Sequence, residues 1–172
     1  ASPGITLTGN VSANTTTTIY GKAVDALGNE TCSLLTTYAH DGVGPSVVSV
    51  AVNKANGSYK TGEVIPVQVT FSEAVTVTGA PQITLETGST DAVVDYTSAA
   101  SSTVLNFNYT VSAGDTSSDL DYASINALAL NSGTIKDAVG NNASLTLPTV
   151  GGPSSIAGNY AIVIDTTAPT VA

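Results

Sequence analysis

The chain has 172 residues, which is enough for one domain or for one domain and part of another. Its formal net charge of −9 includes only four cations, all lysines, so it lacks the dense basic surface that nucleic-acid binding requires. An apolar share of 42% suffices for a hydrophobic core, its small and β-branched residues favour strands, and no apolar run approaches the roughly 20 residues of a membrane-spanning helix.

A hexapeptide near the start of the chain is repeated near its end. DALGNE stands at 25–30, and DAVGNN stands at 137–142. After each copy an Asp stands four residues before a Pro, first as Asp41–Pro45 and then as Asp165–Pro169. Self-similarity of this kind is the signature of a repeat architecture, so the two copies predict equivalent points in successive modules.

The repeat predicts the domain organisation. Residues 1–44 are expected to be the C-terminal part of a preceding module, and residues 45–168 a complete second module. Residues 169–172 would then begin the linker to a further module. The chain is therefore interpreted as a window cut from a tandem array.

Cys32, in the first of these segments, is the only cysteine of the chain. One interpretation is a buried thiol, since free cysteine is among the most buried residue types. The alternative is that its disulfide partner lies in sequence outside this chain, because a leftover cysteine in an exported protein suggests a missing mate.

Two aspartates mark the predicted module joints. Asp41 and Asp165 each stand beside the proline that begins the next module. Each could form a turn with its own backbone, which is the common use of Asp before a linker. Alternatively, a cation could bridge Asp41 to loops of the following module and stiffen the joint.

The second module contains short segments with the pattern of strands. In 63–71 and 103–111, apolar and polar residues alternate, which predicts one buried and one wet face. Pro66 inside the first of these suggests an edge strand or a bulge. Only 120–130 has a pattern that allows a helical turn. The full set of strand candidates is 46–52, 63–71, 75–78, 81–87, 92–97, 103–111 and 160–164, a spacing typical of a β-sandwich.

An acidic loop follows the strand at 103–111. Asp115, Asp119 and Asp121 lie within seven residues, and together they could supply about half of the six to eight oxygen ligands of Ca²⁺. The spacing is not that of an EF-hand loop, and a solvated acidic turn is the alternative interpretation.

The repeated hexapeptide has the composition of a tight turn. Asp and Asn hydrogen-bond to nearby backbone groups, and Gly permits a positive φ. We therefore expect Asp137 to bind the backbone N–H groups of its own turn, with a metal-ligand role for Asp137 or Asp25 as the alternative.

Several stretches resemble a known protein family. TFSEAVTVTGAPQITLETG, NYTVSAGDTSSDLDY, GTIKDAVGNNASLTLP and IVIDTTAPTV look like the tandem bacterial Ig-like modules of large secreted adhesins and surface-fibre proteins. The resemblance covers 45–172, and 1–44 looks like half of a related module whose missing half would hold the mate of Cys32. It implies an all-β fold of Ig-like Greek-key β-sandwich modules in tandem. It also implies a place outside the cell, at the bacterial surface, and neighbouring modules as partners.

The function expected from the resemblance is mechanical spacing or adhesion to a cell-surface protein or glycan. Calcium is the cofactor that the acidic residues suggest. Catalysis is not expected: His40 is the only imidazole, and no nucleophile elbow, phosphate loop or His/Cys metal cluster occurs.

Two other functions remain open. A carbohydrate-binding module could use a platform of five tyrosines, although tyrosine in a sandwich usually packs at the core edge. These tyrosines are Tyr59, Tyr96, Tyr109, Tyr122 and Tyr160. A self-assembling filament could use the incomplete segment 1–44 for strand addition between chains.

Overall fold

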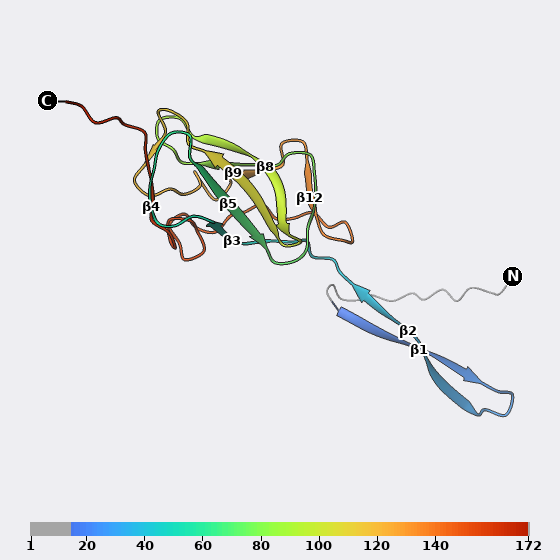
Figure 1. The fold of residues 1–172 in the computed structure, drawn as a ribbon. Helices are drawn as coiled ribbons and strands as arrows, with labels where there is room; N and C mark the ends of the chain where they lie inside the picture. Colours follow the sequence, from blue (N-terminus) through green and yellow to red (C-terminus); the bar gives the residue numbers. More distant parts are fainter. Residues whose placement is uncertain (1–14, 172) are drawn as a thin grey trace. The chain divides into compact units, whose positions relative to one another are not determined.

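The computed structural model describes residues 15–171, with the side chains of residues 100 and 101 set aside. The chain divides into two compact units, Ala1–Val43 and Gly44–Ala172, which are described separately. Every regular element in the described range is a β-strand (Figure 1), which confirms the predicted all-β class.

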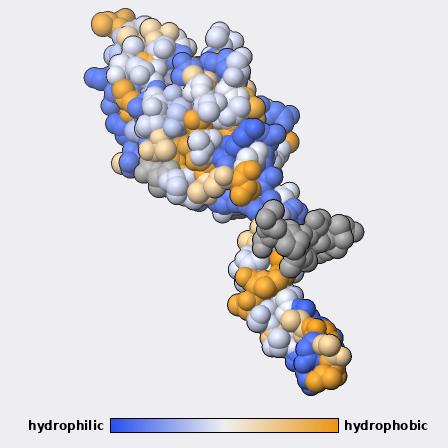
Figure 2. Space-filling view, turned by 90° about the vertical axis from the view of Figure 1, so that its right-hand side faces the viewer, coloured by the Kyte–Doolittle hydropathy of each residue, from blue (hydrophilic) through white to orange (hydrophobic). Residues whose placement is uncertain are grey.

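The first unit is a two-stranded antiparallel hairpin of β1 (Thr15–Val24) and β2 (Glu30–His40). Tyr20, Leu34 and Leu35 are exposed on it. Figure 2 shows apolar residues at the surface of the hairpin face that it draws. A hairpin with both faces in water is marginally stable. Cys32 is exposed on β2, so the buried-thiol interpretation was wrong: in the described part of this unit no second layer covers the strand.

The second unit is built from several sheets. The largest has the strand order β11-β7-β8-β9-β5-β3, a second has the order β10-β13-β4, and β12 pairs with β6. The strands of this unit are β3 (Val47–Val52), β4 (Gly57–Tyr59), β5 (Val64–Phe71), β6 (Thr76–Thr78), β7 (Gln82–Leu85), β8 (Ala92–Ser101), β9 (Val104–Thr110), β10 (Thr116–Ser117), β11 (Leu128–Ala129), β12 (Thr134–Lys136) and β13 (Ile162–Asp165).

The alternation predicted for 63–71 and 103–111 is confirmed in β5 and β9. The apolar residues of β5 that share one face are buried: Ile65, Val67, Val69 and Phe71. Leu105, Phe107 and Tyr109 are buried opposite them, paired with Val69, Val67 and Ile65. Each fully buried side chain of this size contributes about 1.5–3 kcal/mol, so these two strands anchor the core.

Pro66 does not mark an edge, contrary to the sequence-based expectation, because β5 lies between β9 and β3. Its carbonyl accepts a hydrogen bond from the Asn53 N–H at 2.9 Å, just past the last paired residue of β3, Val52. The missing N–H of proline therefore falls where the ladder with β3 has already ended. The stretch 120–130, whose pattern allows a helical turn, contains no helix; it holds turns and β11.

The chain enters the second unit beside the C-terminal end of β5. The Ser72 N–H donates to the Ser46 carbonyl at 2.8 Å, and the Ser46 N–H donates to Ser72 Oγ at 3.0 Å. Ser72 directly follows Phe71, the last residue of β5. We call this end of the unit the entry pole.

The chain leaves the second unit beside the N-terminal end of β5. Thr166 Oγ1 donates to the Asp115 carbonyl at 2.8 Å, and the loop before Asp115 is joined to the start of β5 by the bond from the Val111 N–H to the Glu63 carbonyl at 2.9 Å. We call this end the exit pole. The eight residues of β5 separate the two poles by about 23 Å, at about 3.3 Å per residue.

We predict that Phe107→Ala lowers the free energy of unfolding of the second unit by about 3–5 kcal/mol, because Phe107 is fully buried. Leu27→Ala, at an 89% exposed position in the hairpin turn, should change it by less than about 0.5 kcal/mol. Urea denaturation followed by circular dichroism measures both. Similar losses in the two variants would contradict this location of the core.

Candidate acidic site at the entry pole

The second copy of the hexapeptide forms a turn organised by Asp137. Its Oδ1 accepts backbone N–H bonds from Val139, Gly140 and Asn141 at 2.9, 2.7 and 2.8 Å. Its Oδ2 accepts from Asn141 Nδ2 at 2.8 Å. The side chain is only 6% exposed, so these bonds replace the water it has lost.

The first copy forms the same kind of turn at the tip of the hairpin. Asp25 Oδ1 accepts from the Leu27 and Asn29 N–H groups at 2.9 Å each, and Asn29 Nδ2 donates to Oδ2 at 2.8 Å. Gly28 and Gly140 hold the same place in the two turns with φ of 87° and 99°. The turn predicted from the repeat is therefore confirmed, including its need for glycine.

These bonds keep both aspartates ionised. Burial raises the pKa of Asp137, but the hydrogen bonds from Asn141, Gly140 and Val139 lower it further than burial raises it, so the net direction is down. The pKa of Asp25 is lowered chiefly by the hydrogen bond from the Asn29 side chain. Asp137 is thus a buried, charged carboxylate.

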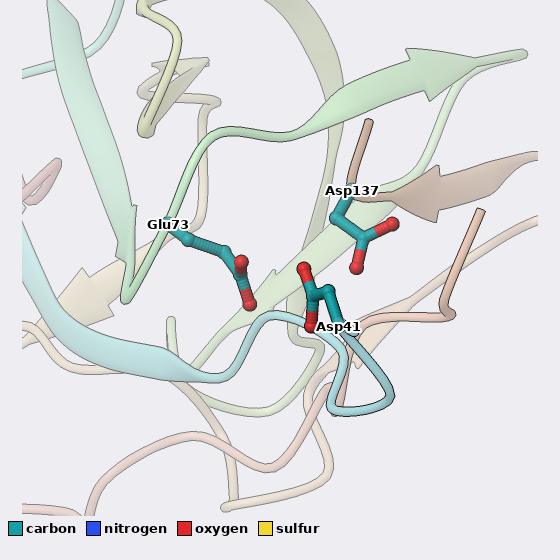
Figure 3. A group of neighbouring side chains, drawn as sticks. All are labelled: Asp41, Glu73 and Asp137. Carbon is teal, nitrogen blue, oxygen red and sulfur yellow. The ribbon is translucent and has the colours of Figure 1, made fainter. Parts of the chain in front are cut away.

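Glu73 is a neighbour that the sequence did not reveal. It is half-buried just after β5, and one of its carboxylate oxygens lies within 4.8 Å of a carboxylate oxygen of Asp137 (Figure 3). The two meet because β12 pairs with β6, which sets Lys136 opposite Thr76. Two carboxylates this close repel each other unless a cation or a donor offsets their charge.

The start of the second unit is fixed against the Asp137 turn. A side chain at Gly44 would place its Cβ 2.0 Å from the Asn142 carbonyl oxygen, so only glycine fits this approach. The carbonyl of buried Pro45 accepts from the Ser144 N–H at 2.7 Å. Sequence reasoning placed a boundary here but did not foresee this contact.

Asp41, drawn with Glu73 and Asp137 in Figure 3, belongs to the first unit. It stands three residues before Gly44, so the covalent chain tethers it within about 11 Å of that residue. Its Oδ1 accepts from the Val43 N–H at 3.3 Å. A metal role for Asp41 and Asp137 stays a prediction.

Asp165 occupies the exit pole. Its Oδ1 accepts a hydrogen bond from the Thr167 N–H at 2.9 Å. This bond forms the local turn that the sequence analysis gave as the alternative to metal binding. On β13 it stands opposite Thr116 of β10.

The carboxylates of the acidic loop serve different partners. Asp115 Oδ2 accepts from Tyr109 Oη at 2.7 Å and from the Ser112 N–H at 2.8 Å. Asp121 is 4% exposed, and its Oδ2 accepts a hydrogen bond from the Gly151 N–H at 2.9 Å. Asp119 is exposed. Two of the three therefore stabilise the fold, and calcium binding by this loop stays a prediction.

Two tyrosines of the proposed sugar platform are buried. Tyr109 and Tyr122 are 2% and 0% exposed, and the Tyr122 hydroxyl donates to the Pro148 carbonyl at 2.7 Å. Burial, aided by the charge of Asp121, raises the pKa of Tyr122 to about 12. Neither ring can stack on a sugar from this position.

Comparison of the chain with protein-family models, curated proteins and solved structures finds no match in any of the three. In the described part of the chain, no helix is long and apolar enough to cross a bilayer.

We predict that Asp137→Asn lowers the melting temperature at neutral pH and flattens the acid limb of the stability curve. Because the folded pKa of Asp137 lies below its ordinary 3.8, its contribution is present above that pH and is lost as the pH falls through the folded pKa. Thermal melts between pH 7 and 2 measure this, with exposed Asp119→Asn as the control. Parallel curves for wild type and Asp137→Asn would contradict the role of Asp137.

Proposed function

We propose that this chain is part of an extracellular structural repeat of a bacterial surface protein, in which tandem Ig-like β-sandwich modules provide spacing and adhesion. The observation that carries the proposal is the path of the chain through the second unit, which it enters at one pole and leaves at the other. A module with this path adds its full length to an array instead of folding the array back on itself. The motif resemblance of 45–172 points the same way.

Two strands at the exit pole suit this role. β4 and β13 run parallel, with Gly57 opposite Ile162 and Tyr59 opposite Ile164. The pairing is extended by the bond from the Ala161 N–H to Asn56 Oδ1 at 3.0 Å. Tension between the poles would slide these strands past each other, so all their hydrogen bonds would bear the load together.

Calcium is the proposed stiffening element. Glu73 and Asp137 present two carboxylates at the entry pole, and the short tether allows Asp41 to supply a third. Ca²⁺ takes six to eight oxygens, so backbone carbonyls and water would complete such a site. A cation there would offset the repulsion between the carboxylates and restrain the linker that precedes Gly44.

We predict that the chain, stretched between handles at its two ends, unfolds its second unit in one step that releases about 400 Å, the extended length of residues 47–165. Asn56→Ala should lower the unfolding force because it removes the bond to Ala161. Asn53→Ala, at an exposed position three residues away, is the matched control. Gradual extension without a force peak would contradict the mechanical role.

We also predict that millimolar Ca²⁺ raises the melting temperature of EGTA-treated protein. Saturation at about 100 times the dissociation constant would add about 2.7 kcal/mol. Glu73→Gln should abolish the increase, whereas Asp119→Asn should leave it intact. If only Asp119→Asn abolished it, the ion would bind the acidic loop; no increase in the wild type would remove both sites.

The exposed hairpin favours a second candidate function, a subunit of a self-assembling filament. Apolar side chains on both faces of β1 and β2 could be covered by a strand of another chain. Light scattering separates the two: a concentration-independent monomer supports the array segment, and growing oligomers support the filament.

A further inference from the structure

Asn56 is followed by a glycine, and no other asparagine of the chain is. The side chain of an asparagine can be attacked by the backbone nitrogen of the next residue, and glycine, which has no Cβ, obstructs this attack least. Asn56 and Gly57 are both exposed, so water and hydroxide can reach them. The pair is therefore chemically suited to deamidation.

Deamidation of Asn56 would start when a base removes the proton of the Gly57 N–H. The nitrogen then forms a bond to Asn56 Cγ, the bond from Cγ to Nδ2 breaks, and ammonia leaves after taking up a proton. Water opens the resulting succinimide ring at either of its carbonyls. The product is aspartate, or isoaspartate if the backbone now runs through Cβ and Cγ. Water is consumed, ammonia is released, and nothing is oxidised or reduced.

In the folded chain both reacting groups are bound to Ala161. The Gly57 N–H donates to the Ala161 carbonyl at 2.9 Å, which keeps the proton on the nitrogen that would attack. The Ala161 N–H donates to Asn56 Oδ1 at 3.0 Å, which fixes the side-chain amide in place. Closure of the succinimide ring therefore requires these bonds to open first.

β13, which follows Ala161, is the anchored member of the pair formed with β4. Its residues Ile162 and Ile164 are 0% and 1% exposed. The Leu120 N–H donates to the Ile162 carbonyl at 2.8 Å, and β13 also pairs with β10 on the side away from β4. Removal of β13 would therefore disrupt the core.

β4 is the member of the pair that can open. It has three residues and stands at the edge of its sheet. Gly57 and Ser58 are exposed, whereas Tyr59 is half-buried and packs against the core. The Tyr59 hydroxyl donates to the Ala55 carbonyl, and Lys54 Nζ lies 5.1 Å from the centroid of the Tyr59 ring. A short edge strand with few buried contacts opens locally more readily than the core.

We propose that Asn56 is a deamidation site that is protected while β4 pairs with β13 and becomes reactive when β4 leaves it. Isoaspartate adds one carbon to the backbone before Gly57, which shifts Gly57 out of register with Ile162. The modified β4 therefore stays off β13, and the modification is a lasting record that the pair has opened. Thermal opening is sufficient, so this chemistry does not depend on the mechanical role proposed above.

The first test compares the full chain with a blocked peptide of residues 55–60 at mildly alkaline pH. Peptide mapping by mass spectrometry measures deamidation, and enzymatic methylation identifies isoaspartate. We expect Asn56 to deamidate at least about tenfold more slowly in the folded chain, the ratio for an opening that costs about 1.4 kcal/mol. Asn53, which precedes Lys54, should stay unmodified over the same period. A rate in the folded chain equal to or above that of the peptide would overturn the proposal.

The second test opens β4 without changing the reacting groups. Tyr59→Ala removes the ring that packs against the core and the hydroxyl bond to Ala55. Deamidation of Asn56 and hydrogen exchange of the Gly57 amide should rise by the same factor, about tenfold, because both need the same opening. Val139→Ala, at a 65% exposed position, is the control and should change neither rate.

Faster exchange of Gly57 without faster deamidation of Asn56 would overturn the proposal. If circular dichroism shows that Tyr59→Ala does not fold, Tyr59→Phe removes only the hydroxyl bond and gives the same comparison with a smaller factor. The isoaspartate form, once separated from the unmodified chain, should exchange its Gly57 amide about as fast as the peptide. A protected Gly57 amide in that form would contradict the lasting loss of the pairing.

Discussion

The burial of one face of β5 is the constraint from which the rest of the second unit follows. Ile65, Val67, Val69 and Phe71 lie inside, and their period of two excludes any register shifted by one residue, which would turn this face to the solvent. In the large sheet β5 is an interior strand, with β9 on one side and the edge strand β3 on the other. Because β5 runs from one pole to the other, it also fixes where the chain enters and leaves. The mechanical proposal and the location of the acidic pair both depend on that geometry.

The repeated hexapeptide forms a local turn, and in the second unit this turn also positions residues that are distant in the sequence. In each copy an aspartate binds the backbone of its own turn, which makes the turn rigid without help from the rest of the protein. In the second unit this turn and the residues after it also contact Gly44 and Pro45, so a packing contact fixes the first residues of the unit where the repeat predicted a module boundary. The same hydrogen bonds keep Asp137 charged beside Glu73, so the turn places two carboxylates close together at the entry pole.

Local patterns in the sequence were enough to predict the longer strands of the second unit and the two aspartate turns, but not the hairpin strands β1 and β2 or the short strands β4, β10, β11 and β12. The alternation in 63–71 and 103–111 fixed two strands because burial of one face is a local property of the chain. DAVGN was predicted as a turn because Asp, Gly and Asn hydrogen-bond to the backbone or permit a positive φ by themselves.

Glu73 could not be assigned in this way: its proximity to Asp137 depends on the pairing of β6 with β12, which joins residues about sixty positions apart. Pro66 was misjudged for a related reason, since its neighbours across the sheet decide whether its missing N–H matters.

The most direct test of the account is the distance between the two poles of the second unit. Nitroxide labels at Ser46→Cys and Thr167→Cys, in a chain with Cys32→Ser, can be measured by pulsed electron spin resonance. The account predicts a single narrow distribution above about 20 Å, in keeping with about 23 Å along β5. A distribution below about 15 Å would put both ends of the unit at one pole, since five residue steps of a strand already span more than that, and would contradict the in-line path on which the proposed function depends.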